Sequence, residues 1–192
     1  MLDIRPERLA NLARACLLKG DYTLSSGQKR SYYFDGRRLT LSSKGLMLVA
    51  EMVWDSLCEL ELPIDAIGGP TLGADPIVAG TMMVAYLNGK QLDGFLVRPR
   101  PKEHGTQGQI EGCLRPGANV VIVDDTTTTG TSALMAIEAA ENRECRVAKV
   151  IVVLDWQQGG SEELREHGYN FQPLLIGDID KGVISPFPKR PH

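Results

Sequence analysis

Five short apolar runs recur between residues 64 and 176, and segments with helical character separate them. The runs cover residues 64–67, 94–97, 119–123, 147–154 and 171–176. Continuous runs of this length are typical of strands that are buried on both faces of a sheet. Alternation with helices requires right-handed crossover connections, which make neighbouring strands parallel. The sequence therefore predicts an α/β fold with a central, mainly parallel sheet flanked by helices.

Residues 1–60 follow a different pattern, which predicts two helices and a hairpin. Apolar residues recur at helical spacing after Pro6 and again after Ser43. The two stripes consist of Leu9, Leu12, Ala13, Cys16 and Leu17 and of Leu46, Val49, Ala50, Val53 and Leu57. Between them, residues 22–35 place aromatic and β-branched side chains around a Ser-Gly turn, which favours a hairpin. At the other end of the chain, residues 185–192 are predicted to be loosely held.

The 192 residues include 21 basic and 24 acidic side chains, and we expect one domain over residues 1–192. The net charge of -3 argues against a broad nucleic-acid face. Four scattered cysteines without metal-ligand spacing indicate a reducing cytoplasm. Charges interrupt the first twenty positions, so no signal peptide is expected. The longest uncharged stretch, residues 76–89, is shorter than the roughly 20 residues that cross a bilayer, so no membrane partner is expected.

The segment from Asn119 to Ser132 has the most specific chemical pattern. It runs from a buried strand through Asp124 and Asp125 into four threonines and a Gly-Thr-Ser sequence, and a helix-forming stretch follows. Ligands of open parallel sheets bind at the carboxyl ends of strands. Free N–H groups at the helix N-terminus can hold a phosphate there, assisted by the hydroxyls of Thr128, Thr129, Thr131 and Ser132. The acid pair can accept hydrogen bonds from a diol and help to hold a divalent cation.

A plain helix cap at Thr131 or Ser132 is the structural alternative for this segment. A cap requires one hydroxyl and no acid pair, so the pattern exceeds that requirement. The chain also lacks the Walker A and GxGxxG patterns, which disfavours a nucleoside triphosphatase and a dinucleotide-binding enzyme.

Basic residues occupy every second position of a short segment, namely Arg98, Arg100, Lys102 and His104. Two prolines between them favour extended backbone, in which alternate side chains point to the same side. Glycines follow at positions 105, 108 and 112 and predict a mobile loop that closes over a ligand. The segment is either an anion clamp or a solvated charged hairpin, and the phosphate-binding pattern elsewhere favours the clamp.

Residues Val120 to Ser132 resemble the thirteen-residue phosphoribosyl pyrophosphate (PRPP) motif of type I phosphoribosyltransferases. That resemblance implies a fold with a small N-terminal hood, formed here by about residues 1–40 and the C-terminal segment. It also implies that Asp124 and Asp125 meet the ribose hydroxyls, with an indirect part in holding Mg²⁺, which PRPP mainly binds. The 5-phosphate would lie in the turn made by Thr126, Thr127, Thr128, Thr129, Gly130, Thr131 and Ser132.

Three further segments are similar to the orotate phosphoribosyltransferase family, and the resemblance covers roughly residues 20 to 180. Arg98, Lys102, His104 and Gly105 match its catalytic loop, and Arg100 stands in for a lysine that is lost at Pro99. The resemblance implies that Lys102 is catalytic, assisted by His104 and Arg98, and that loop 98–112 acts across the interface of a homodimer. Residues 68–76, with Thr71 and Leu72, look like its pyrophosphate loop. Residues 24–35 look like its hood hairpin.

The set implied to bind orotate is Thr128, Trp156, Ser25, Tyr33 and Phe34, and two of its members depart from the family pattern. Trp156 stands where the family has an arginine that binds the orotate carboxylate. A neutral indole N–H in place of a charged fork loses about 1.5–3 kcal/mol of binding free energy. Trp156 is therefore either a pocket residue or a core aromatic. Ser25 stands where many members have lysine, and Lys29 and Arg30 are near enough in sequence to compensate.

The function implied by this resemblance is Mg²⁺-dependent transfer of the phosphoribosyl group of PRPP to orotate. This pentosyl transfer yields orotidine 5′-phosphate and pyrophosphate in UMP biosynthesis. Two alternatives remain: a phosphoribosyltransferase of the same fold that acts on another base, and a non-catalytic PRPP-sensing regulator. A panel of free bases separates transfer to orotate from transfer to another base. Tight PRPP binding without turnover on any base would indicate the regulator.

Overall fold

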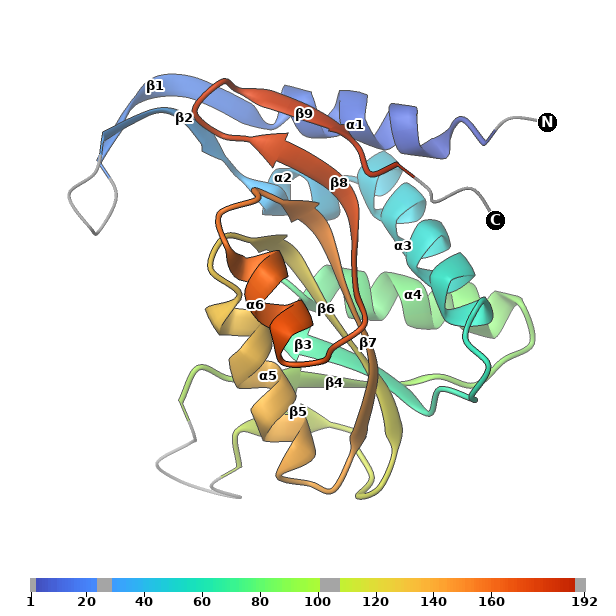
Figure 1. The fold of residues 1–192 in the computed structure, drawn as a ribbon. Helices are drawn as coiled ribbons and strands as arrows, with labels where there is room; N and C mark the ends of the chain where they lie inside the picture. The colour runs from blue at the N-terminus through green and yellow to red at the C-terminus, as the bar shows by residue number, and fades with distance from the viewer. Residues whose placement is uncertain (1–2, 24–28, 101–107, 189–192) are drawn as a thin grey trace.

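A computed structural model describes residues 3–23, 29–100 and 108–188 of the chain (Figure 1). The helices are α1 (Arg5–Ala15), α2 (Gly36–Thr40), α3 (Ser43–Cys58), α4 (Asp75–Leu87), α5 (Thr131–Glu141) and α6 (Gly160–Glu166). The strands are β1 (Leu17–Thr23), β2 (Lys29–Phe34), β3 (Ala66–Pro70), β4 (Asp93–Val97), β5 (Ile110–Gly112), β6 (Asn119–Thr127), β7 (Arg146–Asp155), β8 (Phe171–Asp178) and β9 (Val183–Pro186).

The central sheet has seven strands in the order β5-β4-β3-β6-β7-β8-β9. Strands β4, β3, β6, β7 and β8 are parallel to one another, which confirms the predicted α/β fold with a mainly parallel sheet. The edge strands β5 and β9 run antiparallel to their neighbours. Only four residues, 179–182, join β8 to β9, and an antiparallel pair needs no longer connection.

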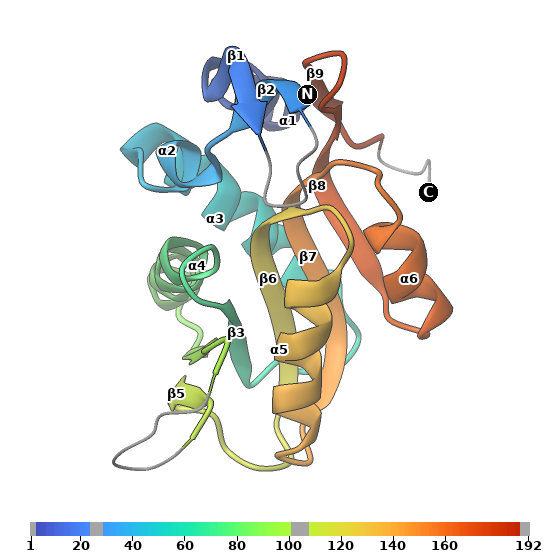
Figure 2. The same ribbon diagram turned by 90° about the vertical axis from the view of Figure 1, so that its left-hand side faces the viewer.

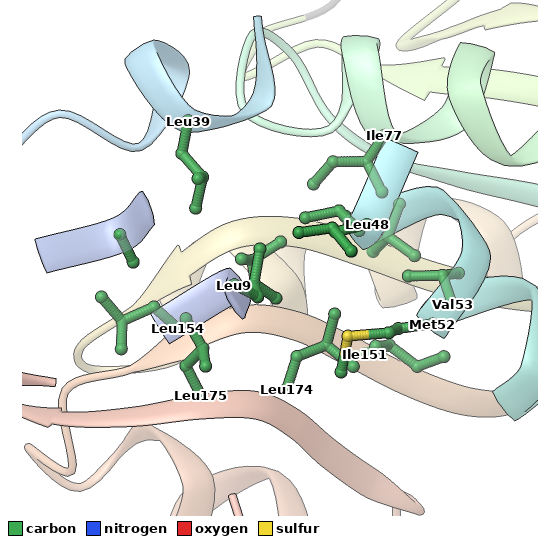
Figure 3. Packing of buried hydrophobic residues seen from close by; sticks show 14 of the residues in the cluster. Leu9, Leu39, Leu48, Met52, Val53, Ile77, Ile151, Leu154, Leu174 and Leu175 are labelled. Atoms are coloured by element: carbon green, nitrogen blue, oxygen red, sulfur yellow. The ribbon is translucent and has the colours of Figure 1, made fainter. Parts of the chain in front are cut away.

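The sheet is buried on both faces because successive side chains of a strand point to opposite sides. In β6, Val121 and Val123 face one apolar cluster, to which α1, α3 and α4 contribute. Val120 and Ile122 face a second cluster, which contains the apolar side of α5. Figure 2 shows α5 lying along β6 and β7, with α3 and α4 away from it. Figure 3 shows part of the first cluster, where Leu9, Leu48 and Ile151 come from three different elements.

The N-terminal region contains the two predicted helices and the hairpin, but it differs from the prediction in three places: the first helix ends earlier, the hairpin begins at Leu17 and not at residue 22, and α2 was not predicted. Helix α1 ends at Ala15, so Leu17 belongs to β1 and not to the helical stripe. Strands β1 and β2 form a separate two-stranded antiparallel sheet. Their connecting turn, residues 24–28, lies outside the described residues. The division of the chain into a core and a hood, within a single domain, stays a prediction.

The prediction that residues 185–192 are loosely held is wrong for its first part. Ser185 and Pro186 belong to β9, where they pair with Ile176 and Leu175. The N–H of Phe187 donates to the carbonyl of Leu174 over 3.0 Å. Such pairing is non-local, so the proline-rich composition of the tail gives no sign of it.

None of the helices within the described residues is long and apolar enough to span a membrane.

Candidate functional site

A cavity of about 800 Å³ opens at the carboxyl ends of the parallel strands. The ends of β3 and β6 contribute to it, together with residues that follow β7 and β8. The hairpin β1–β2 and helix α2 lie at this end of the molecule (Figures 1 and 2). The lining consists of Tyr32, Tyr33, Phe34, Asp35, Gly36, Arg37, Pro70, Thr71, Leu72, Gly73, Asp124, Asp125, Thr126, Thr128, Thr129, Ser132, Trp156, Gln158 and Ile179.

The predicted acid pair lines this cavity from the last part of β6. Asp124 is 7% exposed, and its Oδ1 accepts a hydrogen bond from the N–H of Asp125 over 2.9 Å. Burial raises the pKa of Asp124 well above its usual value, and the neighbouring carboxylate of Asp125 adds to the increase. Burial likewise raises the pKa of Asp125. Two crowded and buried carboxylates favour a ligand that brings hydrogen-bond donors or a cation.

Two glycines allow other segments to approach the acid pair closely. A Cβ at Gly73 would lie 2.4 Å from Oδ1 of Asp124 and 2.7 Å from Oδ1 of Asp125. A Cβ at Gly36 would lie 2.5 Å from Oδ2 of Asp125. Only residues without a side chain fit at these two positions. The pyrophosphate-loop candidate and the start of α2 therefore both contact the carboxylates.

The loop before α4 contains the predicted residues Thr71 and Leu72, which both line the cavity. The peptide bond between them is cis. The hydroxyl of Thr71 donates to Oδ2 of Asp75, the first residue of α4, over 3.0 Å. This bond ties the loop to the helix that follows it.

The threonine-rich turn joins β6 to α5, and four of its predicted residues, Thr126, Thr128, Thr129 and Ser132, line the cavity. Gly130 caps α5 with φ of 79°, so neither Thr131 nor Ser132 is the cap residue. The alternative of a plain hydroxyl cap at those positions is therefore wrong. Thr127 is buried, and its carbonyl accepts from the N–H of Trp156 over 3.0 Å. The N–H groups in the first turn of α5 have no partners within the helix, as an anion site requires.

Trp156 follows β7 and satisfies both of the roles that the sequence left open. It is 6% exposed and belongs to the first apolar cluster, the one that contains Val121 and Val123, yet it also lines the cavity. Its ring meets Phe34 edge to face, with centroids 5.6 Å apart and an interplanar angle of 73°. A Cβ at Gly177 would lie 2.7 Å from the indole ring, so the ring is packed closely on that side as well. Trp156 thus offers the cavity part of a fixed aromatic surface.

The other predicted base-binding residues lie in different surroundings. Phe34 is buried at the end of β2, while Tyr33 is 40% exposed and lies 5.5 Å from the ring of Tyr22. Both line the cavity. Ser25 lies outside the described residues.

The structure does not bring the described part of the cationic segment into the cavity. Arg98 is exposed, and its Nε pairs with Oε1 of Glu111 in β5 over 2.9 Å. Arg100 is exposed as well, and neither arginine lines the cavity. Lys102 and His104 fall within residues 101–107, outside the described residues, as does much of the proposed loop.

Arg37 lines the cavity but was not identified from the sequence. It is the second residue of α2, a five-residue helix that the apolar pattern does not reveal. Its Nε lies 3.4 Å from Oδ1 of Asp35. The only sequence signal is its place directly after the hairpin that carries Tyr33 and Phe34. Among the described residues that line the cavity, Arg37 is the one basic side chain.

A metal site built from protein ligands alone is not present among the described residues, where no group of three or more His, Cys, Asp or Glu side chains could hold an ion. The acid pair supplies two carboxylates only. It fits a cation that is bound mainly by oxygen atoms of a substrate and that the carboxylates help to hold indirectly.

Comparison with known proteins gives a consistent set of relatives. No protein-family model matches the chain. The chain is 38% identical to the orotate phosphoribosyltransferase of Tropheryma whipplei (strain Twist) over 182 residues, 94% of this chain and 85% of that protein. It is 39% identical to the enzyme of the same name from Synechocystis sp. over 183 residues, 94% of this chain and 91% of that protein.

Solved structures show the same likeness in three dimensions. The orotate phosphoribosyltransferase of Mycobacterium tuberculosis H37Rv, crystallised with Fe(III) dicitrate, aligns with a TM-score of 0.79 and 34% identity. A structure of that enzyme in complex with PRPP aligns with a TM-score of 0.76 and 31% identity. Each alignment covers 93% of this chain and 99% of the other.

Proposed function

The chain belongs to the orotate phosphoribosyltransferase family, and from this premise we propose that it transfers the phosphoribosyl group of PRPP to orotate in UMP biosynthesis. The bond from C1 of the ribose to the pyrophosphate oxygen breaks, while N1 of orotate loses its proton and forms the new bond to C1. The products are orotidine 5′-phosphate and pyrophosphate. The observation that carries this proposal is the cavity that combines the acid pair, the threonine turn and the 71–73 loop.

The ribose 5-phosphate half of PRPP fits the end of β6 and the turn after it. Asp124 and Asp125 accept hydrogen bonds from the two ribose hydroxyls, for which the charged form of each acid is the better acceptor. Residues 126–132 hold the 5-phosphate with hydroxyl groups and with N–H groups at the start of α5. This binding fixes C1 of the ribose in the middle of the cavity.

The pyrophosphate half fits the loop with Thr71 and Leu72 and, from the cationic segment, Arg98, Arg100, Lys102 and His104. Negative charge develops on the leaving pyrophosphate as the glycosidic bond breaks, while the ribose gains oxocarbenium character. Lys102 stabilises that charge, and His104 and Arg98 assist it. In the described residues Arg98 pairs with Glu111, outside the cavity. A segment that enters the neighbouring subunit of a homodimer is consistent with this position.

Mg²⁺ is the proposed cofactor. The acid pair would hold it indirectly, through the hydroxyls of bound PRPP, and the ion would neutralise pyrophosphate charge when bound. The buried carboxylates, whose pKa values are raised by their surroundings, fit a site that is completed by a cation.

Orotate fits between the hood hairpin and the strand ends, where Thr128, Trp156, Tyr33 and Phe34 line the cavity. Ser25 completes the proposed set. The aromatic surface of Phe34 and Trp156 favours a planar base, whereas no described cation lies where the family has arginine. A base without a carboxylate is therefore the second candidate substrate.

We also propose a homodimer in the cytoplasm. Met83, Tyr86 and Leu87 on α4 are 60–75% exposed, and a second subunit would cover such an apolar surface.

Purified protein mixed with PRPP, Mg²⁺ and orotate tests the proposal. We expect the orotate absorbance to fall in this mixture. In a second mixture, which starts from orotidine 5′-phosphate and pyrophosphate, we expect orotate absorbance to appear. Uracil, adenine and other free bases form the panel for the alternative. A faster reaction with any of these than with orotate would reassign the substrate, and PRPP binding without turnover on any base would indicate the regulator.

A further inference from the structure

The described lining of the cavity is acidic, although the proposed substrate is strongly anionic. Its charged side chains are Asp35, Arg37, Asp124 and Asp125, three acids and one base. The 5-phosphate of PRPP has the N–H groups of the turn at α5 as partners. The part of the proposed diphosphate loop that lines the cavity consists of Pro70, Thr71, Leu72 and Gly73, none of which is charged. Among the described residues that line this cavity, Arg37 is therefore the one cation near enough to meet the diphosphate.

Arg37 is positioned by the contact between α2 and the acid pair. A Cβ added at the preceding residue, Gly36, would lie only 2.5 Å from Oδ2 of Asp125, so the backbone of Gly36 lies close to that carboxylate. A Cβ added at Gly73 of the diphosphate loop would likewise lie 2.7 Å from Oδ1 of the same carboxylate. Both segments therefore meet at Asp125, and Arg37 follows one of them directly. The proposed orotate site includes Trp156, whose ring contacts Phe34.

The present partner of Arg37 holds it weakly. Its Nε lies 3.4 Å from Oδ1 of Asp35, and the two side chains are 50% and 25% exposed. An ion pair of this length and exposure contributes little to stability. A diphosphate offers the guanidinium a pair of oxygens in fork geometry, which is a stronger interaction than a single long contact with a carboxylate. Arg37 can therefore exchange Asp35 for a bound diphosphate.

We propose that Arg37 binds the diphosphate group of PRPP and of the released pyrophosphate, an inference that rests on the proposed function. It would supply, from the same chain that holds the ribose, a positive charge that the loop with Thr71 and Leu72 lacks. The role is distinct from recognition of the orotate carboxylate, for which the proposed function assigns the set that includes Trp156.

The test compares Arg37→Ala and Arg37→Lys with Arg38→Ala. Arg38 is the next residue of α2, is exposed and does not line this cavity, so it is a matched control for charge and helix position. Loss of a hydrogen bond to a charged group should raise the KM for PRPP about tenfold to a hundredfold in Arg37→Ala. The KM for orotate should stay within about twofold, and Arg37→Lys should recover part of the loss because it keeps the charge without the fork.

Direct binding separates this inference from the proposed function. Titration of the protein with inorganic pyrophosphate and Mg²⁺ in a calorimeter should show the same weakening in Arg37→Ala and none in Arg38→Ala, with unchanged melting temperatures. If the wild type does not convert orotate, the proposed function fails, and the pyrophosphate titration still decides the role of Arg37. A rise in KM for orotate alone, or equal losses in Arg38→Ala, would overturn the inference.

Discussion

Two segments are predicted to bind the same substrate: the turn between β6 and α5, and the cationic segment after β4. They differ in how the structure holds them and in whether they line the cavity. The turn lies wholly within the described residues, starts from buried Asp124 and is held by backbone contacts with residues 156–160. The cationic segment contributes Arg98 and Arg100 to the described residues, and neither lines the cavity. The difference is in keeping with the proposal that the β6–α5 region holds the ribose phosphate and that groups from elsewhere act on the leaving pyrophosphate.

Lys102→Ala gives the largest expected effect, because it removes the cation assigned to the leaving group. Removal of one group that stabilises transition-state charge lowers kcat by roughly 10²- to 10³-fold. Steady-state kinetics with PRPP and orotate measure this loss, and Lys44→Ala, an exposed lysine on α3, is the control. The KM for orotate should change little. Equal losses in base affinity and in kcat would argue that Lys102 binds substrate and does not act in the chemical step.

Asp124→Asn should separate activity from stability in the other region. Activity should fall by roughly a hundredfold, since the ribose loses a charged acceptor that is largely buried in the site. Burial raises the pKa of Asp124 in the folded protein, so folding takes up a proton between the unfolded and folded pKa values. The free energy of unfolding therefore falls as the pH rises through that interval. Asparagine removes this penalty, and the ligand-free variant should melt at a higher temperature than the wild type at pH 7.

The melting-temperature difference should shrink as the pH approaches about 4, the unfolded pKa of an aspartate. Asp178→Asn is the control of opposite sign, because its hydrogen bond with Lys181 lowers the pKa of Asp178. The Asp178 carboxylate stabilises the folded protein at pH values above its unfolded pKa. This stabilisation is lost as the pH falls through the lower pKa of the folded state. Asp178→Asn should therefore be neutral or slightly destabilising at pH 7. A lower melting temperature for Asp124→Asn at pH 7 would contradict the burial argument.

Much of the β6–α5 region was predictable because its signals are contiguous. The strand, the acid pair, the threonines and the glycine follow one another, so local rules locate the site at the strand end. The edge strand β9, the role of Gly36 and the contact of Trp156 with Phe34 depend on residues far apart in sequence. Arg37 was missed for the same reason, since only the fold of α2 against Asp125 brings it to the cavity.

Gly130→Ala tests whether the shape of the turn matters for binding. Gly130 has φ of 79°, and a Cβ there would lie 3.1 Å from the carbonyl oxygen of Gly160. The left-handed conformation costs alanine about 1–2 kcal/mol, which urea unfolding would measure. The KM for PRPP should rise about tenfold because the N–H groups that hold the phosphate shift, an effect of about 1.4 kcal/mol.

Gly117→Ala is the matched control for this substitution, with φ of 78° and nothing within 4 Å of the added Cβ. It should lose similar stability and keep the wild-type KM for PRPP. A KM that rises equally in both variants would mean that general destabilisation, and not the shape of the turn, weakens binding.

The smallest effect is expected at the pair between Arg98 and Glu111, which tests whether the cationic segment must give up a contact when substrate binds. The side chains are 46% and 35% exposed, and a pair of this kind contributes about 0–1 kcal/mol. If Arg98 leaves Glu111 to reach pyrophosphate, Glu111→Gln should lower the KM for PRPP by at most about fivefold, the factor that 1 kcal/mol corresponds to. The effect should weaken in high salt because exposed charges are screened. A raised KM would instead mean that Glu111 holds the segment in its binding position, and the two regions would then share a preformed arrangement.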